Sequence, residues 1–141
     1  MVYRAGIDIG STTVKLAVID DGGNIVFSDY KRHSAHTQEV LAELLRKAER
    51  ELGDVSVRFG ITGSGSLNLS KILGITFVQE VVAVATALKS RYPQTDVAIE
   101  LGGEDAKIIY FKGGLDERMN GVCAGGTGAF IDQMEIGRAH V

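Results

Sequence analysis

The chain has 141 residues, of which 45% are hydrophobic, and a formal net charge of −3 at pH 7, so it is long enough to bury one ordinary hydrophobic core. It has no basic block that could neutralise nucleic-acid phosphates and no apolar run long enough to span a bilayer. The composition therefore argues against nucleic-acid and membrane partners. A single cysteine cannot form an intramolecular disulfide, and no charged-then-apolar leader opens the sequence. Both features favour a cytoplasmic protein.

The first part of the chain is predicted to form a β-meander. The β-rich segments 3–9, 14–19 and 25–30 alternate with turn sequences. Gly10-Ser11-Thr12 is the first of these turns, and Asp21-Gly22-Gly23-Asn24 is a strong hairpin signal for the second.

Helices and a short strand are predicted to follow the meander. Thr37 can cap a helix whose apolar residues recur at helical spacing as far as Leu52, and Gly53 ends it. The other elements expected before Pro93 are a strand over 57–61, a strand-to-helix turn over Gly63-Ser64-Gly65, and helices over 67–73 and 81–91.

The pattern of the opening meander returns after Pro93. Ile99-Glu100-Leu101-Gly102 matches Ile7-Asp8-Ile9-Gly10 at an offset of about 92 residues, and Lys107 matches Lys15. Strands are expected over 97–101 and 106–111, followed by a glycine hairpin at Lys112-Gly113-Gly114. A duplicated meander with an acidic residue and a glycine turn after each first strand indicates two related lobes.

The first glycine turn has the residue types of a magnesium and phosphate site. A carboxylate at a strand end, here Asp8, can hold hydrated Mg²⁺. Main-chain N–H groups and hydroxyls of the turn can bind phosphate oxygens, and the residues that offer them are Gly10, Ser11, Thr12 and Thr13. Lys15 adds positive charge, although in the second strand it could simply face solvent. The alternative is an ordinary hairpin turn, and it is the second copy that favours the phosphate site.

The second turn offers two further acidic candidates. Glu100 is expected to orient Mg²⁺ or an attacking water, because phosphoryl transfer depends on positioning and charge stabilisation. Asp105 is a second candidate from the same turn, and the backbone groups come from Gly102, Gly103 and Glu104. The alternative for both acids is a solvated turn residue.

Cys123 is predicted to be a metal ligand. A lone cysteine is most often a small buried side chain, but this one lies in a loop that is too glycine-rich for ordinary core. Thr127 can cap a helix that begins there, and the positive end of that helix would favour a thiolate or a thiolate-bound cluster.

His33 and His36 are spaced closely enough to suggest a metal site. They lie in a polar connecting segment without a nearby cysteine or carboxylate partner, so a solvated loop is the preferred interpretation.

Three motifs carry a resemblance to a known family, and together the resemblance covers residues 1 to about 134. They are GIDIGSTTVK at 6–15, IELGGEDAK at 99–107 and NGVCAGGTG at 120–128. The duplicated acid–glycine turns resemble the actin, sugar kinase and heat-shock ATPase superfamily. The cysteine loop is similar to that of the activators of 2-hydroxyacyl-CoA dehydratases and the ATPase subunits of benzoyl-CoA reductases. Glu100 departs from the pattern, because many relatives have aspartate there.

The resemblance implies an α/β fold of ribonuclease-H-like, actin-like ATPase lobes with a mixed β-sheet. The first lobe would span residues 1–92, and the second, truncated, residues 93–141. Asp8, Glu100 and Asp105 would be the catalytic residues, and the two turns with Lys15 would hold the cofactor. The pattern decays after Met134, so residues 135–141 are expected to be a truncation or a remnant of cloning.

The family also implies cofactors and partners. ATP and Mg²⁺ would lie between the lobes, and Cys123 would be one of two cysteines that each subunit of a homodimer contributes to a shared [4Fe–4S] cluster. The second cysteine is absent here, so this chain is expected to be an inactive fragment. The partners would be a 2-hydroxyacyl-CoA dehydratase or reductase component and an electron donor such as ferredoxin or flavodoxin. The alternatives are a sugar or acetate kinase and a non-catalytic nucleotide-sensing module of the same superfamily.

Overall fold

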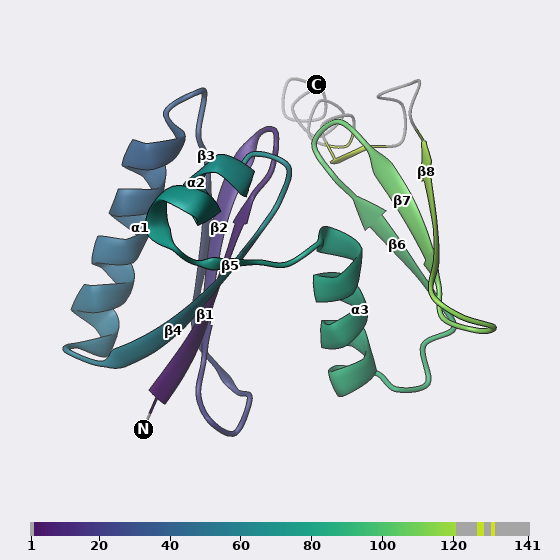
Figure 1. Ribbon diagram of the computed structural model, residues 1–141, viewed down its shortest axis with the longest axis horizontal. Coiled ribbons are helices and arrows are strands. Elements are labelled where there is room, and N and C mark those ends of the chain that lie inside the picture. The colour runs from purple at the N-terminus through teal and green to yellow at the C-terminus, as the bar shows by residue number, and fades with distance from the viewer. Residues whose placement is uncertain (1, 121–126, 129–130, 132–141) are drawn as a thin grey trace, which may run out of the picture. The chain divides into compact units, whose positions relative to one another are not determined.

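The computed structural model describes residues 2–120, 127–128 and 131 of the chain (Figure 1). The chain divides into two compact units, residues 1–79 and 80–141, and each unit combines helices with its own β-sheet. The predicted α/β class is therefore confirmed.

The first unit is built on a mixed sheet with the strand order β3-β2-β1-β4-β5. Its strands are β1 Val2–Ile9, β2 Thr13–Ile19, β3 Ile25–Arg32, β4 Ser56–Thr62 and β5 Thr76–Phe77, and its helices are α1 Thr37–Leu52 and α2 Leu67–Leu73. β1, β2 and β3 pair antiparallel, whereas β4 pairs parallel with both β1 and β5. The predicted meander is confirmed, and β5 is a short strand that the sequence pattern did not predict.

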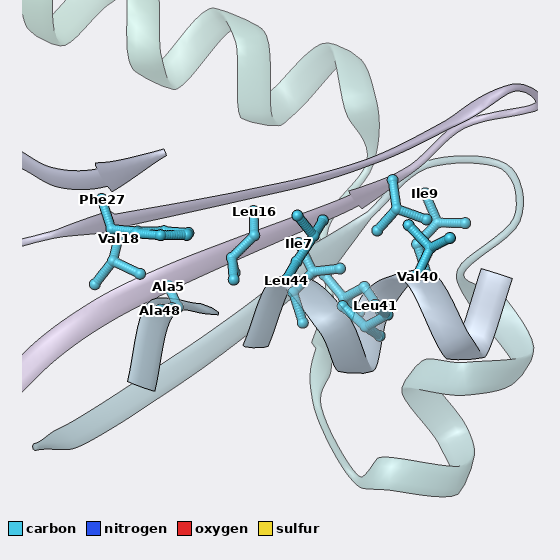
Figure 2. Packing of buried hydrophobic residues seen from close by; sticks show 12 residues of the cluster. Ala5, Ile7, Ile9, Leu16, Val18, Phe27, Val40, Leu41, Leu44 and Ala48 are labelled. Atoms are coloured by element: carbon cyan, nitrogen blue, oxygen red, sulfur yellow. The ribbon is translucent and has the colours of Figure 1, made fainter. Parts of the chain in front are cut away.

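The core of the first unit lies between this sheet and α1. Alternate residues of a strand point to opposite faces, and β1 buries Ala5, Ile7 and Ile9 on the face toward the helix. The helix presents its own buried stripe to them, made of Val40, Leu41, Leu44 and Ala48 (Figure 2). The helical spacing seen in the sequence thus reflects one face of α1 packed on the sheet.

The alternation along β1 also places Asp8. Because Ile7 and Ile9 are buried against α1, Asp8 points to the opposite face of the sheet and is partly exposed. Packing of the core therefore decides which way this carboxylate faces.

The second unit contains a helix and an antiparallel sheet with the strand order β6-β7-β8. Its elements are α3 Glu80–Arg91, β6 Val97–Leu101, β7 Ala106–Tyr110 and β8 Asp116–Asn120. Gly113 and Gly114 connect β7 to β8 with φ angles of 81° and 119°, values that glycine adopts without steric cost. This is the glycine hairpin predicted there.

The predicted cap of α1 was wrong. His36 is the N-cap residue, it makes no side-chain capping hydrogen bond, and Thr37 is already helical. A tight turn explains the shift, because the N–H of His36 donates to the carbonyl of His33 at 2.6 Å. Ser34 and Ala35 within that turn have positive φ angles, and the chain enters the helix one residue earlier than a threonine cap would allow.

The predicted lobe boundary between residues 92 and 93 stays a prediction. The start of the repeat after Pro93 indicates this boundary, whereas α3 is grouped with the second sheet in the compact unit 80–141. Within the part of the chain that the structure describes, no helix is long and apolar enough to cross a membrane.

Candidate functional site

The first glycine turn joins β1 to β2 directly after Asp8. The N–H of Gly10 donates to the carbonyl of Thr13 at 3.0 Å, which leaves Ser11 and Thr12 at the tip of the turn. Among the described residues, the N–H groups of Ser11 and Thr12 donate to no hydrogen-bond acceptor. Two main-chain donors at the tip of a turn are suited to binding an anion.

Lys15 contacts Asp8 instead of pointing only into solvent. The two residues are direct partners in the register of β1 and β2, and Nζ of Lys15 lies 2.9 Å from Oδ2 of Asp8. The side chains are 54% and 31% exposed, respectively, so both stay accessible to a ligand. The structure thus brings a carboxylate, an ammonium group and free main-chain donors to one end of the sheet.

The loop between β4 and α2 packs against the same turn. The N–H of Gly65 donates to the carbonyl of Ile9 at 3.0 Å. A Cβ on Gly63 would lie 2.3 Å from that carbonyl oxygen and 2.6 Å from Oδ1 of Asp8. The strand-to-helix turn predicted here is confirmed, but the sequence did not reveal that it touches Asp8.

Gly63→Ala should destabilise the first unit by about 2–4 kcal/mol, because it combines a positive φ with a clash against fixed backbone. The φ of Gly63 is 98°. Gly60→Ala is the matched control: it lies in β4 with nothing within 4 Å of its added Cβ, and alanine should slightly stabilise the strand. Urea unfolding of both variants measures the difference, and equal midpoints would contradict the close approach of Gly63 to Asp8.

The second glycine turn repeats the geometry of the first. The N–H of Gly102 donates to the carbonyl of Asp105 at 2.8 Å. A Cβ on Gly102 would lie 2.3 Å from Oδ1 of Asp105, so this carboxylate occupies space that only glycine leaves free. Gly103 and Glu104 form the tip of the turn, and Glu104 is exposed.

Glu100 and Lys107 are cross-strand partners in β6 and β7, as Asp8 and Lys15 are in β1 and β2. One carboxylate oxygen of Glu100 is buried. Unlike the first copy, the second copy keeps its lysine inside the protein, because the side chain of Lys107 is only 9% exposed.

Lys107 binds Glu80, a residue that the sequence analysis missed. Its ammonium group hydrogen-bonds the carboxylate of Glu80 and lies 3.5 Å from Oδ2 of Asp105. Burial by itself lowers the pKa of Lys107, but the hydrogen bond to Glu80 and the charges of Glu100, Glu80 and Asp105 outweigh burial and raise it above its ordinary value. Glu80 begins α3, many residues before the turn, so no local motif marks it.

Each turn is also bonded to a glycine at a loop–helix junction. In the first unit that glycine is Gly65, and in the second the N–H of Gly128 donates to the carbonyl of Gly102 at 2.7 Å. The carbonyl of Thr127 accepts the N–H of Ile131 at 3.2 Å, one helical turn away, as expected where a helix begins. The two glycines are not equivalent in the repeat, because Gly65 follows β4 and bonds Ile9, whereas Gly128 follows β8 and bonds Gly102, the counterpart of Gly10.

Both histidines lie in the loop between β3 and α1, as expected, but His33 is only partly exposed, so its predicted full solvation was wrong. Its Nε2 lies 3.1 Å from the carbonyl oxygen of Gly10 in a partly buried contact. His36 is exposed and lies 3.9 Å from the carboxylate of Glu39. The end of β3 runs beside the first turn, and this long-range pairing brings His33 there.

Cys123, the predicted cluster ligand, lies outside the described residues. Within residues 2–120 and the other described positions, no three His, Cys, Asp or Glu side chains are grouped so as to hold a metal ion.

The first turn fits a hydrated magnesium ion bound together with phosphate. Mg²⁺ usually takes one or two protein carboxylates and keeps several waters, so Asp8 alone suffices as a protein ligand. Thr62 of β4 is the direct neighbour of Asp8 in the register of β1 and β4. Oγ1 of Thr62 is buried and has no hydrogen-bond partner among the described residues. This hydroxyl could therefore form a hydrogen bond with a water that hydrates the metal ion.

Comparison with known proteins matches a segment of the chain that contains both glycine turns. Residues 5–136 match the sequence profile of the BadF/BadG/BcrA/BcrD ATPase family. The chain is 30% identical over 138 residues to the (R)-2-hydroxyglutaryl-CoA dehydratase activating ATPase of Acidaminococcus fermentans. It is 32% identical over 139 residues to the 2-hydroxyisocaproyl-CoA dehydratase activator of Clostridioides difficile. These alignments cover 94% of this chain in both cases, and 52% and 51% of the relatives.

A solved structure extends the similarity to three dimensions. The activator of the 2-hydroxyisocaproyl-CoA dehydratase from Clostridium difficile with bound ADPNP is 32% identical and superposes with a TM-score of 0.75, over 94% of this chain and 50% of that one. The expected actin-like ATPase fold is confirmed. The chain spans about half the length of the curated relatives it matches, and it belongs to the BadF/BadG/BcrA/BcrD ATPase family.

Proposed function

We propose that this chain is the phosphate-binding part of an ATP-hydrolysing activator of a 2-hydroxyacyl-CoA dehydratase. The observation that carries the proposal is the repeated turn, with the same Gly N–H bond and the same acid–lysine cross-strand pair in both units. The first turn would supply a carboxylate, an accessible ammonium group and main-chain donors to a nucleotide phosphate, and the second would add its carboxylates and its backbone, while Lys107 stays bound to Glu80. Relatives named as dehydratase activators, one of them solved with bound ADPNP, support the nucleotide and the partner.

Each residue of the turns would have a separate role. Asp8 would hold hydrated Mg²⁺, while the N–H groups of Ser11 and Thr12 and the hydroxyl of Thr13 bind phosphate oxygens. Lys15 would exchange its contact with Asp8 for a phosphate when metal and nucleotide bind. Glu100 and Asp105 would orient the metal or the attacking water, with the backbone of the second turn, Gly102, Gly103 and Glu104, against the phosphates.

The family resemblance extends the proposal to electron transfer. Cys123 would be one thiolate ligand of a [4Fe–4S] cluster shared across a homodimer. This cluster would donate single electrons to the dehydratase. A ferredoxin or flavodoxin would reduce it. Both the second cysteine and the remaining part of the nucleotide site would come from sequence that this chain does not contain.

A competition experiment tests the phosphate site in the chain itself. Both phosphate turns belong to this chain and the adenosine site would not, so Mg–tripolyphosphate should bind with about the same affinity as Mg–ATP and compete with it. Isothermal titration calorimetry measures the two affinities. Tight binding that depends on the adenine base, with no competition by tripolyphosphate, would contradict the proposed role of the turns.

Cys123→Ser in a full-length protein carrying this segment should abolish stable cluster binding and leave nucleotide affinity nearly unchanged, because the cluster and the phosphates would use different loops. Iron and acid-labile sulfide, determined after anaerobic purification, give the first quantity, and calorimetry with Mg–ATP gives the second. A serine variant with its full iron and sulfide content would show that Cys123 is structural.

A further inference from the structure

His33 holds the first phosphate turn through two separate hydrogen bonds. Its main-chain N–H donates to the carbonyl of Thr12 at 3.1 Å, and Nε2 of its ring lies 3.1 Å from the carbonyl oxygen of Gly10. One residue directly after β3 therefore contacts carbonyls on both sides of Ser11, and nothing in the sequence indicated this role.

The ring of His33 is fixed by its own turn. The N–H of Ala35 donates to Nδ1 of the ring at 3.2 Å. A nitrogen that accepts a hydrogen bond carries no proton, so the proton of the neutral ring is on Nε2, which donates to Gly10. Ser34 and Ala35 have φ angles of 44° and 70°, which are uncommon for residues other than glycine. The chain accepts this unfavourable backbone conformation in the segment that aims the ring at the turn.

The bond to Gly10 also decides where a ligand-binding group points. The peptide between Gly10 and Ser11 is trans, as are all others described, because no cis peptide bond is present among them. In a planar trans peptide the C=O and N–H groups point in opposite directions. With the carbonyl of Gly10 directed at His33, the N–H of Ser11 faces away from the ring, toward the open side of the turn.

We propose that His33 is a positioning residue for phosphate binding: its Nε2–H donates to Gly10 and thereby orients the N–H of Ser11 toward a phosphate oxygen. The proposal rests on the phosphate-binding function proposed for the turn. His33 itself would not touch the phosphate, since its hydrogen bonds go to the turn and to Ala35.

Substitutions of His33 by Gln and by Asn distinguish the hydrogen bond to Gly10 from the one that the ring accepts from Ala35. In His33→Gln the side-chain amide can reach Gly10 as Nε2 does, but it has no acceptor at the place of Nδ1. In His33→Asn the side-chain oxygen can accept the N–H of Ala35, as in an Asx turn, but the side chain is too short to reach Gly10. His33→Leu removes both bonds at similar volume. His36→Leu is the matched control, because the side chain of His36 is 73% exposed.

Binding of Mg–tripolyphosphate to the whole chain gives the main readout. His33→Gln should bind within about twofold of wild type, and His33→Asn and His33→Leu about five- to tenfold more weakly, the effect of one neutral hydrogen bond. His36→Leu should bind as wild type does. Normal binding by His33→Asn together with weak binding by His33→Gln would overturn the proposal, since only the local turn would then matter. Equal thermal melting midpoints for the Gln and Asn variants would exclude a general loss of stability.

Nuclear magnetic resonance tests the same contact without any ligand. The ring of His33 should be in the Nε2–H tautomer, and the amide resonance of Ser11 should shift in His33→Asn but not in His36→Leu. A Nδ1–H tautomer, or a Ser11 amide that is insensitive to His33, would overturn the proposal. If these spectra are as expected and the wild-type chain binds no Mg–tripolyphosphate, the phosphate function of the turn fails, and the role of His33 in phosphate binding fails with it. The hold of His33 on the turn would nevertheless be established.

Discussion

Lys107→Met is expected to lower the free energy of unfolding of the second unit by about 3 kcal/mol, because it removes a buried ammonium group from among carboxylates. The side chain of Lys107 is 9% exposed and that of its partner Glu80 is 27% exposed. The methionine keeps most of the buried aliphatic length, so the loss reports charge and hydrogen bonding more than a cavity. Hydrogen exchange of the β6–β8 amides measures the effect on this unit specifically.

Lys15→Met is the matched control at the equivalent position of the first unit. Its contact with Asp8 is made by side chains that are 54% and 31% exposed, and exposed ion pairs contribute about 1 kcal/mol or less. The two substitutions are chemically identical and differ in burial. Losses of similar size in both variants would contradict a specific contribution from the buried pair.

The contribution of Lys107 should also depend on pH in a defined direction. Its pKa in the folded protein is raised above the ordinary value of 10.5, so folding favours the protonated form. The stabilisation is fully present below pH 10.5 and is lost as the pH rises through the folded pKa. The difference in stability between wild type and Lys107→Met should therefore be constant around neutral pH and shrink only above 10.5. A difference that already disappears near neutral pH would contradict the raised pKa.

Asp8→Ala in a full-length protein carrying this segment should reduce the rate of ATP hydrolysis by about 10²–10³-fold, because charge stabilisation by a bound metal matters most in the transition state. The affinity for Mg–ATP should fall by less, since Ser11, Thr12 and Lys15 would still bind the phosphates. Steady-state kinetics and calorimetry on the same variant separate the two effects.

Asp21→Ala is the control for this variant, since Asp21 is an exposed turn acid between β2 and β3, at the end of β2 away from Asp8. It should leave both hydrolysis and affinity unchanged. Equal losses of rate and affinity in Asp8→Ala would mean that Asp8 contributes uniform binding and no transition-state stabilisation.

Local patterns predicted most of the elements. The apolar spacing of α1 reflects a helix face packed on a sheet, and the strand bounds of β1, β2 and β6 follow from alternation and from the glycine turns that end them. The helix start failed because a threonine before an apolar run is a common capping signal, whereas here the turn over 33–36 placed His36 at the cap. β5 could not be predicted from the sequence, because a strand of 2 residues is too short to show an alternating pattern.

The duplicated acid, glycine turn and lysine could be found from the sequence because both copies keep one offset along the chain. A constant offset means that the same register recurs, so Asp8 faces Lys15 and Glu100 faces Lys107 in both sheets. The glycines that cover the turns could not be found in this way. Gly65 follows the fourth strand of its unit and Gly128 follows the third strand of its own, so the offset of the turns does not relate them.

Composition and local pattern were sufficient for the α/β class, for the repeat and for the candidate residues of the two turns. Tertiary structure decided what each of these residues touches. Glu80 reaches Lys107, Gly63 reaches Asp8, and His33 reaches Gly10. Each of these contacts joins residues that are far apart along the chain, and each depends on which face of a strand is buried and on how neighbouring strands are paired. Short-range sequence signals carry no information on such pairings, because burial of the core as a whole selects them.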